Sequence, residues 1–345
     1  MAKRKKKSVK KRRLKRWKQL GFLGKVWRFL WVTFLIVWGF SLFQVLYCTI
    51  FNPPITPLMV QRFFQQVKDP DRVVRFERDY VSIDDISPNL VNAVVVSEDG
   101  LFMYHHGFDI KQMKMAYIEG KTGRRHRGGS TISQQTAKNC FLPHTHSMVR
   151  KAVEAYYTTL IEMVWSKKRI MERYLNVIEF GDGIYGCEAA SQHYFGHSAK
   201  ELSKREAALL AVCLPTPLRS NPGHPSGYLN RQSSVVQGRM ARYGRINLEA
   251  KREDLNQRYV RQMDEENLWD FVVWMLTDGE SLTSKHGNHH EKSYAPASSH
   301  HHASSNKSEE AEQEEPEEVI ESGAPIDPLP VEESVEPAAE PSSEE

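Results

Sequence analysis

The stretch VRKAVEAYYTTLIEMVW, residues 149–165, is the clearest indicator of the fold class of this chain. Its apolar residues recur at spacings of three and four, which is the pattern of one buried face on a long helix. The residues on that face are Val149, Val153, Tyr156, Tyr157, Leu160, Ile161, Val164 and Trp165. Ser166 follows as the cap of a shorter helix over residues 167–176. We therefore expect helical structure on both sides of Ser166.

Helix signals continue away from this stretch in both directions. Serine or glycine precedes a run of helix-forming residues at three further places. The expected helices are NLVNAVVVSED after Ser87-Pro88, TISQQTAKNCF after the Gly128-Gly129-Ser130 turn and cap, and Ser203 to Leu214. Strand signals are confined to short pieces such as RVVRF, residues 72–76. The sequence thus predicts an all-α domain over residues 52–277, with a less regular, basic segment at 108–127.

The N-terminal end differs in composition from the middle of the chain. Residues 1–28 hold many Lys and Arg and no Asp or Glu, and the 23 residues from 29 to 51 carry no charge. An apolar run of that length spans a bilayer. It ends in bulky residues, whereas a secretory signal peptide ends in small residues at its cleavage site. We therefore expect an uncleaved transmembrane helix, a cytoplasmic basic arm, and the remaining chain outside.

Two interpretations of the basic arm are open. Nucleic acid binds such Lys/Arg blocks, but beside a membrane span anionic lipid headgroups explain the same residues, so we favour membrane lipids and expect no nucleic acid. At the other end, residues 278–345 have too few apolar groups to offset their ordering entropy, and we expect a disordered, acidic tail. Metal binding by its histidines is the weaker alternative. The net charge of +4 is a difference between these two biased ends.

The four cysteines point to neither a zinc site nor a disulfide framework. Cys48 lies in the membrane span, and the other three show no C-x-x-C spacing. We expect buried thiols, with a Cys140–Cys187 or a Cys187–Cys213 bridge left open.

A candidate catalytic acid lies in VVVSEDGLFMYHHG, residues 94–107, where Glu98 and Asp99 follow three valines. A carboxylate at the edge of an apolar run is partly desolvated, which raises its pKa toward the range useful for proton transfer. Two solvated acids at a helix end are the simpler alternative.

Polar residues on the helix after Ser130 indicate an anion site. Thr131, Gln135 and Lys138 follow at spacings of four and three, so one face presents a hydroxyl, an amide and an ammonium. The Gly128-Gly129-Ser130 turn would leave backbone N–H groups free at the helix start, where phosphate binds readily. A plain turn is an equally weighted alternative.

A second acid, Glu154, lies within one helical turn of Arg150 and Lys151. An ordinary surface ion pair is the simple explanation. The functional alternative is an acid kept ionised by two cations that also meet an anionic substrate. Glu98 beside apolar residues and Glu154 beside cations are two carboxylates in different settings, which is how acid and base roles are divided.

These residues fall into four motifs that follow one another over about eighty positions. The motifs are Glu98-Asp99-x-x-Phe102-x-x-His105-x-Gly107, Gly128-Gly129-Ser130-Thr131-Ile132-Ser133-Gln134-Gln135-x-x-Lys138-Asn139, Arg150-Lys151-x-x-Glu154 and Glu172-x-Tyr174-Leu175-Asn176. In this order they resemble the peptidoglycan glycosyltransferases that polymerise lipid II. The chain is most similar to the monofunctional biosynthetic transglycosylases of that family, which are membrane-anchored and have no second enzyme domain.

The resemblance implies a lysozyme-like, all-α glycosyltransferase head with a small mobile jaw, placed at 108–127. It implies that Glu98 is the general base, that Lys138, Arg150 and Lys151 hold pyrophosphates, and that Glu154 supports leaving-group departure. A divalent cation, Mg²⁺ or Mn²⁺, is an optional helper through which Glu154 would act, and no set of metal ligands is assigned. The other matched positions are expected to bind substrate, namely Asp99, Phe102, His105, Gly128, Ser130, Thr131, Gln135 and Asn139.

The same resemblance implies a bacterial cytoplasmic-membrane enzyme that joins lipid II to a growing glycan strand, in company with other cell-wall synthesis or division proteins. Two alternatives remain, a lysozyme-like enzyme that cleaves this glycan and an inactive wall-binding scaffold. The three cations argue against the first, because cleavage needs no pyrophosphate site, and two intact acids argue against the second. The bifunctional relatives' K-T-G motif occurs here at residues 121–123, but it lies between glycosyltransferase motifs.

Overall fold

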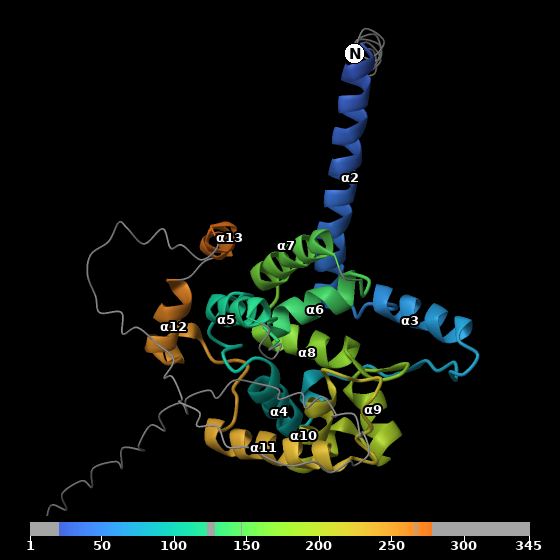
Figure 1. Cartoon of the computed structure of the whole chain (residues 1–345), viewed down its shortest axis with the longest axis vertical. Helices are drawn as coiled ribbons and strands as arrows, with labels where there is room; N and C mark the ends of the chain where they lie inside the picture. The colour runs from blue at the N-terminus through green and yellow to red at the C-terminus, as the bar shows by residue number, and fades with distance from the viewer. Residues whose placement is uncertain (1–20, 123–127, 146, 266–267, 278–345) are drawn as a thin grey trace, which may run out of the picture.

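The computed structural model describes residues 21–122, 128–145, 147–265 and 268–277, and the fold of this part is helical (Figure 1). Its α-helices are α2 (Phe22–Ile50), α3 (Pro57–Lys68), α4 (Pro88–Glu98), α5 (Ile110–Lys121), α6 (Ile132–Phe141), α7 (Met148–Val164), α8 (Lys167–Val177), α9 (Cys187–Phe195), α10 (Lys204–Cys213), α11 (Gly227–Tyr243), α12 (Gln257–Asp264) and α13 (Leu268–Leu276). Short 3₁₀ turns are η1 (Ile83–Asp85), η2 (Ala199–Glu201) and η3 (Arg252–Asp254).

One small sheet interrupts the helices. Its strands are β1 (Glu77–Arg78), β2 (Glu179–Gly181) and β3 (Ile184–Tyr185), in the order β1-β3-β2. Strand β3 pairs in parallel with β1 and antiparallel with β2. The strand expected at residues 72–76 was therefore wrong in position, because strand pairing begins only at Glu77. The sheet joins the chain after α3 to the chain after α8.

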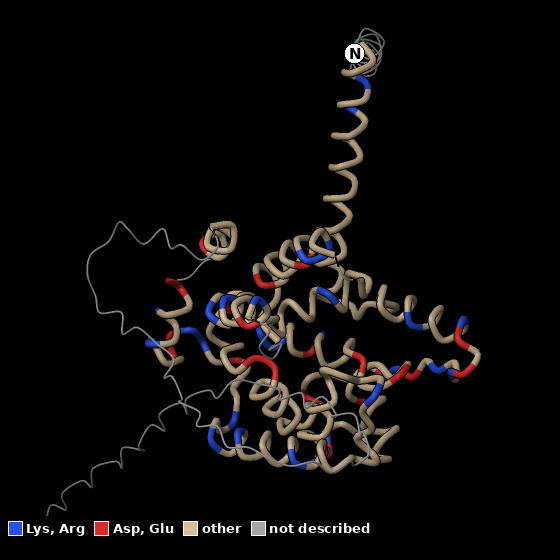
Figure 2. The backbone as a smooth tube through the Cα atoms, in the orientation of Figure 1, with Lys and Arg blue, Asp and Glu red and all other residues tan. Residues whose placement is uncertain are grey.

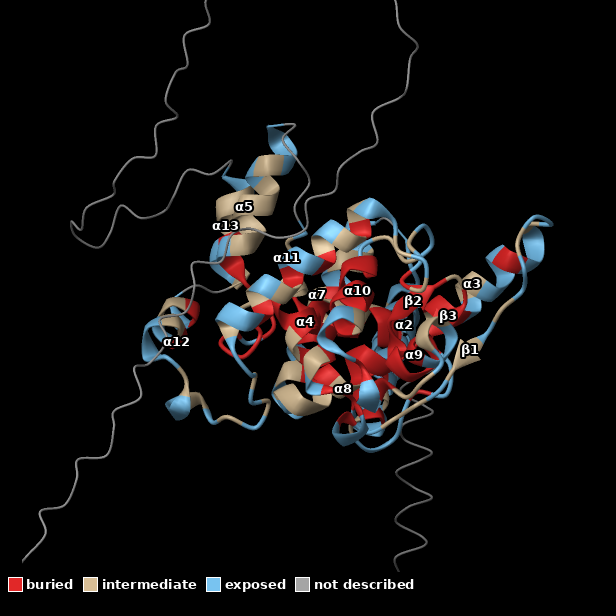
Figure 3. Cartoon of the chain, turned by 90° about the horizontal axis from the view of Figure 1, so that it is seen from below, coloured by how far each residue is buried: buried red, intermediate tan, exposed pale blue. Residues whose placement is uncertain are grey.

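The core is built around α4, which packs against α10 and α11, and around α6, which packs against α7 and α8. Leu90, Ala93, Val94 and Val95 of α4 are fully buried. Figure 3 shows the buried residues concentrated in α4, α10 and the strands. Helix α4 therefore runs through the core and ends at Glu98. The Glu98 carboxylate lies at the edge of the apolar interior.

The predicted all-α fold is confirmed, and three predicted caps are present. The side chains of Ser87, Ser166 and Ser203 accept from the backbone N–H two or three residues further on, at the starts of α4, α8 and α10. The cap before α6 was wrong by one residue. Thr131, not Ser130, is the cap, and it forms a reciprocal pair with Gln134.

Two other expectations are corrected. The segment expected to be irregular contains the helix α5, capped by Asp109, whose Oδ1 accepts from Gln112 N–H at 2.9 Å. Residues 123–127 of that segment lie outside the described residues, and so do residues 1–20 of the basic arm and the tail 278–345. All four cysteines are free and buried, which confirms the thiols and excludes either proposed bridge.

The buried face of α7 is narrower than the spacing predicts. Tyr157 and Ile161 are buried, but Val149 is 75% exposed and Val153 and Val164 are also exposed. Helix α7 lies against the lower end of α2 (Figure 1). The exposed valines of α7 therefore lie outside the protein core.

Helix α2 is long and apolar enough to cross a membrane. It begins at Phe22, seven residues before the predicted span. Its charges, Lys25 and Arg28, lie near its start, and its remaining length is uncharged (Figure 2). Most of its large side chains are exposed.

The last turns of α2 are bound to the domain by hydrogen bonds. Trp165 Nε1 donates to Val45 O (3.1 Å), Arg173 Nε to Cys48 O (3.0 Å) and Arg169 Nη2 to Ile50 O (2.8 Å). A helix leaves its last four carbonyls without partners of its own, and two of these donors fill that need. The apolar helix therefore continues into the domain as a fixed element of it.

Candidate active site

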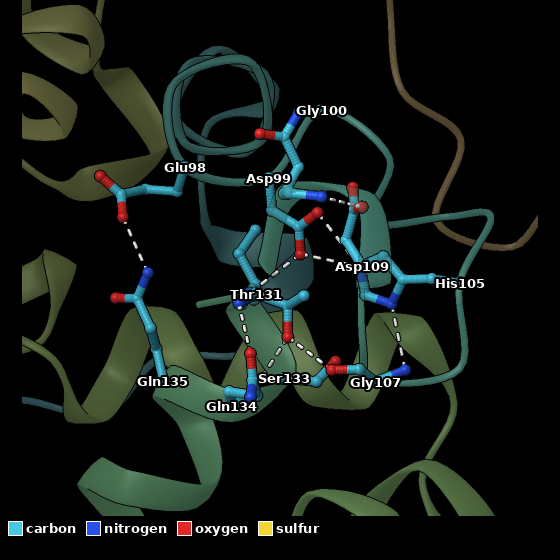
Figure 4. Close-up of polar contacts among 12 residues, drawn as sticks. Glu98, Asp99, Gly100, His105, Gly107, Asp109, Thr131, Ser133, Gln134 and Gln135 are labelled. Carbon is cyan, nitrogen blue, oxygen red and sulfur yellow. Dashed lines mark hydrogen bonds and ion pairs between the residues drawn. The ribbon is translucent and has the colours of Figure 1, made fainter. Parts of the chain in front are cut away.

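The carboxylate of Glu98 is held by two neighbouring helices. Gln135 of α6 donates from Nε2 to Glu98 Oε2 at 2.8 Å, and the Tyr174 hydroxyl of α8 donates to Gln135 Oε1 at 3.3 Å. Because the tyrosine binds the amide oxygen, the amide nitrogen faces Glu98. Figure 4 shows Glu98 directed toward Gln135, away from Asp99.

Burial raises the pKa of Glu98 above its ordinary value, and the neighbouring charge of Asp99 acts in the same direction. The Gln135 hydrogen bond and the Lys138 charge oppose the shift. The raised pKa expected from the valines is therefore present in the structure. A carboxylate in this setting is a stronger base than one in water, which suits proton abstraction near neutral pH.

Asp99 has a different role from its neighbour. Its Oδ2 accepts from the backbone N–H of Ile132 at 2.9 Å, at the first turn of α6, and both its oxygens lie within 3.1 Å of His105 Nε2. Asp99 is buried. The positive end of α6 is thus occupied by the chain's own carboxylate. The Ile132 N–H group is therefore not free to bind a phosphate, whereas the predicted seat at the Gly128-Gly129-Ser130 turn stays a prediction.

Gly107 closes the loop that Asp99 begins. It has a positive φ of 91°, and a Cβ there would lie 2.8 Å from Thr158 Cγ2. Its N–H donates to His105 Nδ1 (3.0 Å), and its carbonyl accepts from Thr131 Oγ1 (2.6 Å). His105 therefore carries its proton on Nε2 and donates to Asp99.

A cluster of cations surrounds Glu154 on α7. Glu154 is 2% exposed, and its oxygens accept from Arg150 Nη1 (2.6 Å) and Lys151 Nζ (2.5 Å). Lys151 also donates to Ser130 Oγ at 3.0 Å. Burial lowers the pKa of Lys138, whose ammonium lies in the fields of Glu154, Arg150, Lys151 and Glu98. The charge of Lys138 therefore acts on both acids, Glu98 and Glu154.

A buried ion pair between Lys167 and Glu162 stabilises the loop that follows Glu98. Lys167 Nζ donates to Glu162 Oε1 (2.8 Å) and to His105 O (2.7 Å), and it lies 4.7 Å from the centre of the Phe102 ring. Ser133 Oγ also donates to Glu162. Burial lowers the pKa of Lys167. This pair ties α6, α7 and α8 to the loop that follows Glu98.

The structure separates the predicted site residues into two groups. Those partly exposed beside the two acids are Gln135, Lys138, Arg150, Lys151 and Ser130, with Gly128 exposed nearby. Those buried within the protein are Asp99, Phe102, His105, Thr131 and Asn139. Burial contradicts direct substrate contact by the second group, and Thr131 leaves the predicted donor face because its hydroxyl caps α6.

Two residues of the site were not among the predicted ones. Tyr174 lies in a recognised motif, and its burial in an otherwise apolar helix face signals a hydroxyl that needs a partner. Lys167 follows a helix cap, where a surface lysine is the ordinary expectation, so no sequence signal marks it.

Tyr174→Phe is expected to lower kcat/KM for the chemistry at Glu98 about threefold to tenfold, because one hydrogen bond of about 0.5–1.5 kcal/mol orients Gln135. Steady-state kinetics would measure the change. Tyr194→Phe is the matched control, since its hydroxyl donates to Phe180 O at 3.3 Å away from this network. Equal activity of both variants would contradict the role of Tyr174.

The donor set beside Glu154 does not suit a divalent cation. Both carboxylate oxygens already accept from cationic side chains. Among the described residues, no group of three or more His, Cys, Asp or Glu side chains could hold a metal ion.

Comparison with known proteins identifies the family. A family model described as "Transglycosylase" matches residues 66–241, about half of the chain. The chain belongs to the transglycosylase family. All four motifs and every residue of the Glu98 and Glu154 clusters fall inside the matched part.

Curated relatives of this transglycosylase carry the name "Biosynthetic peptidoglycan transglycosylase". The protein of Shewanella oneidensis is 39% identical over 227 residues, which cover 65% of this chain and 96% of the relative. The protein of Bacteroides thetaiotaomicron is 49% identical over 183 residues (53% and 73%), and that of Xanthomonas campestris is 42% identical over 204 residues (59% and 83%). The chain is a peptidoglycan glycosyltransferase, and lipid II and the glycan strand are the substrates of its family.

Proposed function

We propose that this transglycosylase polymerises lipid II with Glu98 as general base and with Lys138, Arg150 and Lys151 as the pyrophosphate site. The product is a β-1,4-linked glycan strand, formed with inversion at MurNAc C1, and the leaving group is undecaprenyl diphosphate. The observation that carries the proposal is a desolvated carboxylate, Glu98, held by Gln135, together with a separate cluster of cations around Glu154; the charge of Lys138 acts on both acids.

The base step uses the geometry around Glu98. The 4-hydroxyl of the acceptor GlcNAc gives its proton to the Glu98 carboxylate as its oxygen forms the bond to C1 of the donor MurNAc. Gln135 fixes one carboxylate oxygen by its 2.8 Å hydrogen bond. The reaction parallels that of inverting glycosidases, with a sugar hydroxyl in place of water.

The leaving-group step uses the cations. As the bond from C1 to the pyrophosphate oxygen breaks, the electron pair leaves with the pyrophosphate, and fixed positive charges stabilise it. Arg150 and Lys151 are positioned for this by Glu154, which binds both of them. We assign Glu154 the supporting role of orienting and partly neutralising these cations.

Asp99, His105 and Thr131 act as positioning residues in this proposal. Their hydrogen bonds join the chain after Glu98 to the first turn of α6. Helix α6 also carries Gln135 and Lys138. The base and the cations therefore sit on elements whose relative placement is fixed by buried contacts.

We also propose the membrane arrangement. Helix α2 crosses the bacterial cytoplasmic membrane once, with Lys25, Arg28 and the basic arm inside, as the positive-inside rule favours. The domain after it then faces outward, where lipid II is polymerised. Protease added to spheroplasts should digest the domain, and full protection would contradict this orientation.

The experiment for the reaction is incubation of the purified full chain, in detergent, with fluorescent lipid II. Polymerisation predicts long glycan products and release of undecaprenyl diphosphate. A parallel incubation with preformed glycan strands tests the hydrolase alternative, which predicts their shortening. An absence of both products would leave only the scaffold alternative and would overturn the proposal.

A further inference from the structure

The C-terminal helix of the described chain, α13, has apolar residues on two opposite sides. Its sequence is LWDFVVWML, and Asp270 is its single charged residue. One side packs against α5, where Phe271 is buried and the Trp274 ring meets Tyr117 edge to face at 5.5 Å. That side is explained by the fold.

The other side of α13 is apolar and faces away from the protein. Trp269 and Leu276 are 71% and 76% exposed. They lie seven residues apart, with Val272 and Val273 between them at spacings of three and four, so the four form one helix face. Trp269 and Leu276 are exposed, and Val272 and Val273 between them are half-buried. An apolar face with exposed ends of this kind marks a surface that contacts something else.

The position of this face relative to α2 indicates what it contacts. Figure 1 shows α13 at the end of the domain from which α2 emerges, at the level of α7. On α7, Met148 and Val149 are exposed as well. Since α2 passes through the bilayer, the elements beside its point of exit lie at the bilayer surface.

The polar residues near α13 fit lipid headgroups. Lys114 of α5 places its ammonium 6.0 Å from the centre of the Trp274 ring, and Lys111 is exposed one turn earlier. Tryptophans and lysines are the side chains that gather at the boundary between hydrocarbon and headgroups. The cations suit anionic lipids, whose phosphates lie at that depth.

A second copy of the chain fits this face less well. A helix of nine residues is about 14 Å long and about 10 Å wide. One face of it therefore falls well short of the roughly 800 Å² per partner that a stable dimer buries. Partial immersion in a bilayer needs no such minimum area.

We propose that α13 is an interfacial membrane helix, seated in the outer leaflet by the Trp269, Val272, Val273 and Leu276 face, and that it holds α5 at the bilayer surface. The inference rests on the proposed membrane crossing by α2. Helix α5 in turn packs against the Gly128-Gly129-Ser130 turn. The contact is close, since a Cβ at Gly129 would lie 2.8 Å from Ala116 Cβ. Membrane seating of α13 thus positions α5 beside Ser130, which binds Lys151.

The test is the membrane depth of a nitroxide label on the full chain in phosphatidylethanolamine/phosphatidylglycerol vesicles. The labelled variants are Trp269→Cys and Leu276→Cys, and Lys200→Cys on η2 is the aqueous control, since its side chain is 62% exposed. The native cysteines are buried, and the unsubstituted chain serves as the labelling blank. Power saturation measures collisions with oxygen, which concentrates in lipid, and with a water-soluble nickel chelate.

At both α13 positions we expect more collisions with oxygen and fewer with the chelate than at the control. Collision rates equal to those of the control would show that the face lies in water. Suppression of both collisions would show a protein contact such as a second copy. Either result overturns the proposal. The depth measurement needs no turnover, so its failure is distinct from a failure of lipid II polymerisation.

Discussion

Glu98→Gln is expected to lower the rate of lipid II polymerisation by about 10²–10⁴-fold, the usual contribution of a positioned general base. The amide keeps the size and polarity of the carboxylate but cannot accept the acceptor's proton. Lipid II should still bind through the cations of α6 and α7, so a binding measurement on the same variant should give an affinity close to that of the unsubstituted chain.

The matched control is Glu253→Gln, an exposed glutamate of η3. Near-normal polymerisation by Glu98→Gln would remove Glu98 as the base, and a collapse of its lipid II binding would show that it holds substrate instead. Misfolding is checked by thermal unfolding. Because the pKa of Glu98 is raised in the folded chain, its ionisation reduces stability as the pH rises through that pKa. The variant should therefore unfold no lower than the parent at neutral pH.

Lys138→Met is expected to lower turnover by about 10²–10³-fold, as does removal of one fixed group that stabilises developing charge. Methionine keeps the length and apolar stem of the side chain but removes its positive charge. Because the positive charge of Lys138 lowers the pKa of Glu98, removal of this charge raises that pKa further. Polymerisation kinetics at saturating lipid II would measure the effect on turnover.

Lys204→Met serves as the control for that variant, because Lys204 is exposed at the start of α10. A change confined to KM would contradict the account, since it would mean that Lys138 contributes equally to substrate and transition-state binding.

Much of the site could be predicted from local patterns. The valines before Glu98 predict its desolvation, and helical spacing predicts that Arg150 and Lys151 meet Glu154; both depend on neighbours within two turns. The caps Ser87, Ser166 and Ser203 are local for the same reason.

The remaining features depend on contacts between distant segments. Asp99 reaches the start of α6 from 33 positions away, and its hydrogen bond to the Ile132 N–H group removes that donor from the expected anion site. Val149 has the spacing of a core residue, yet it is exposed on α7, the helix that packs against α2. Periodicity distinguishes apolar from polar faces, but not a protein core from a bilayer.

We propose that ionisation of Glu98 controls the reaction, and the pH dependence of kcat/KM for the parent and for Gln135→Leu measures this most directly. The acid limb reports the pKa of the free enzyme's base. It should lie above the ordinary carboxyl range, because burial raises the pKa of Glu98.

Loss of the Gln135 hydrogen bond, worth about 0.5–1.5 kcal/mol, should move that limb up by as much as about one pH unit. Gln237→Leu on α11 should leave it in place. An acid limb that stays at the same pH in Gln135→Leu would contradict Glu98 as the base.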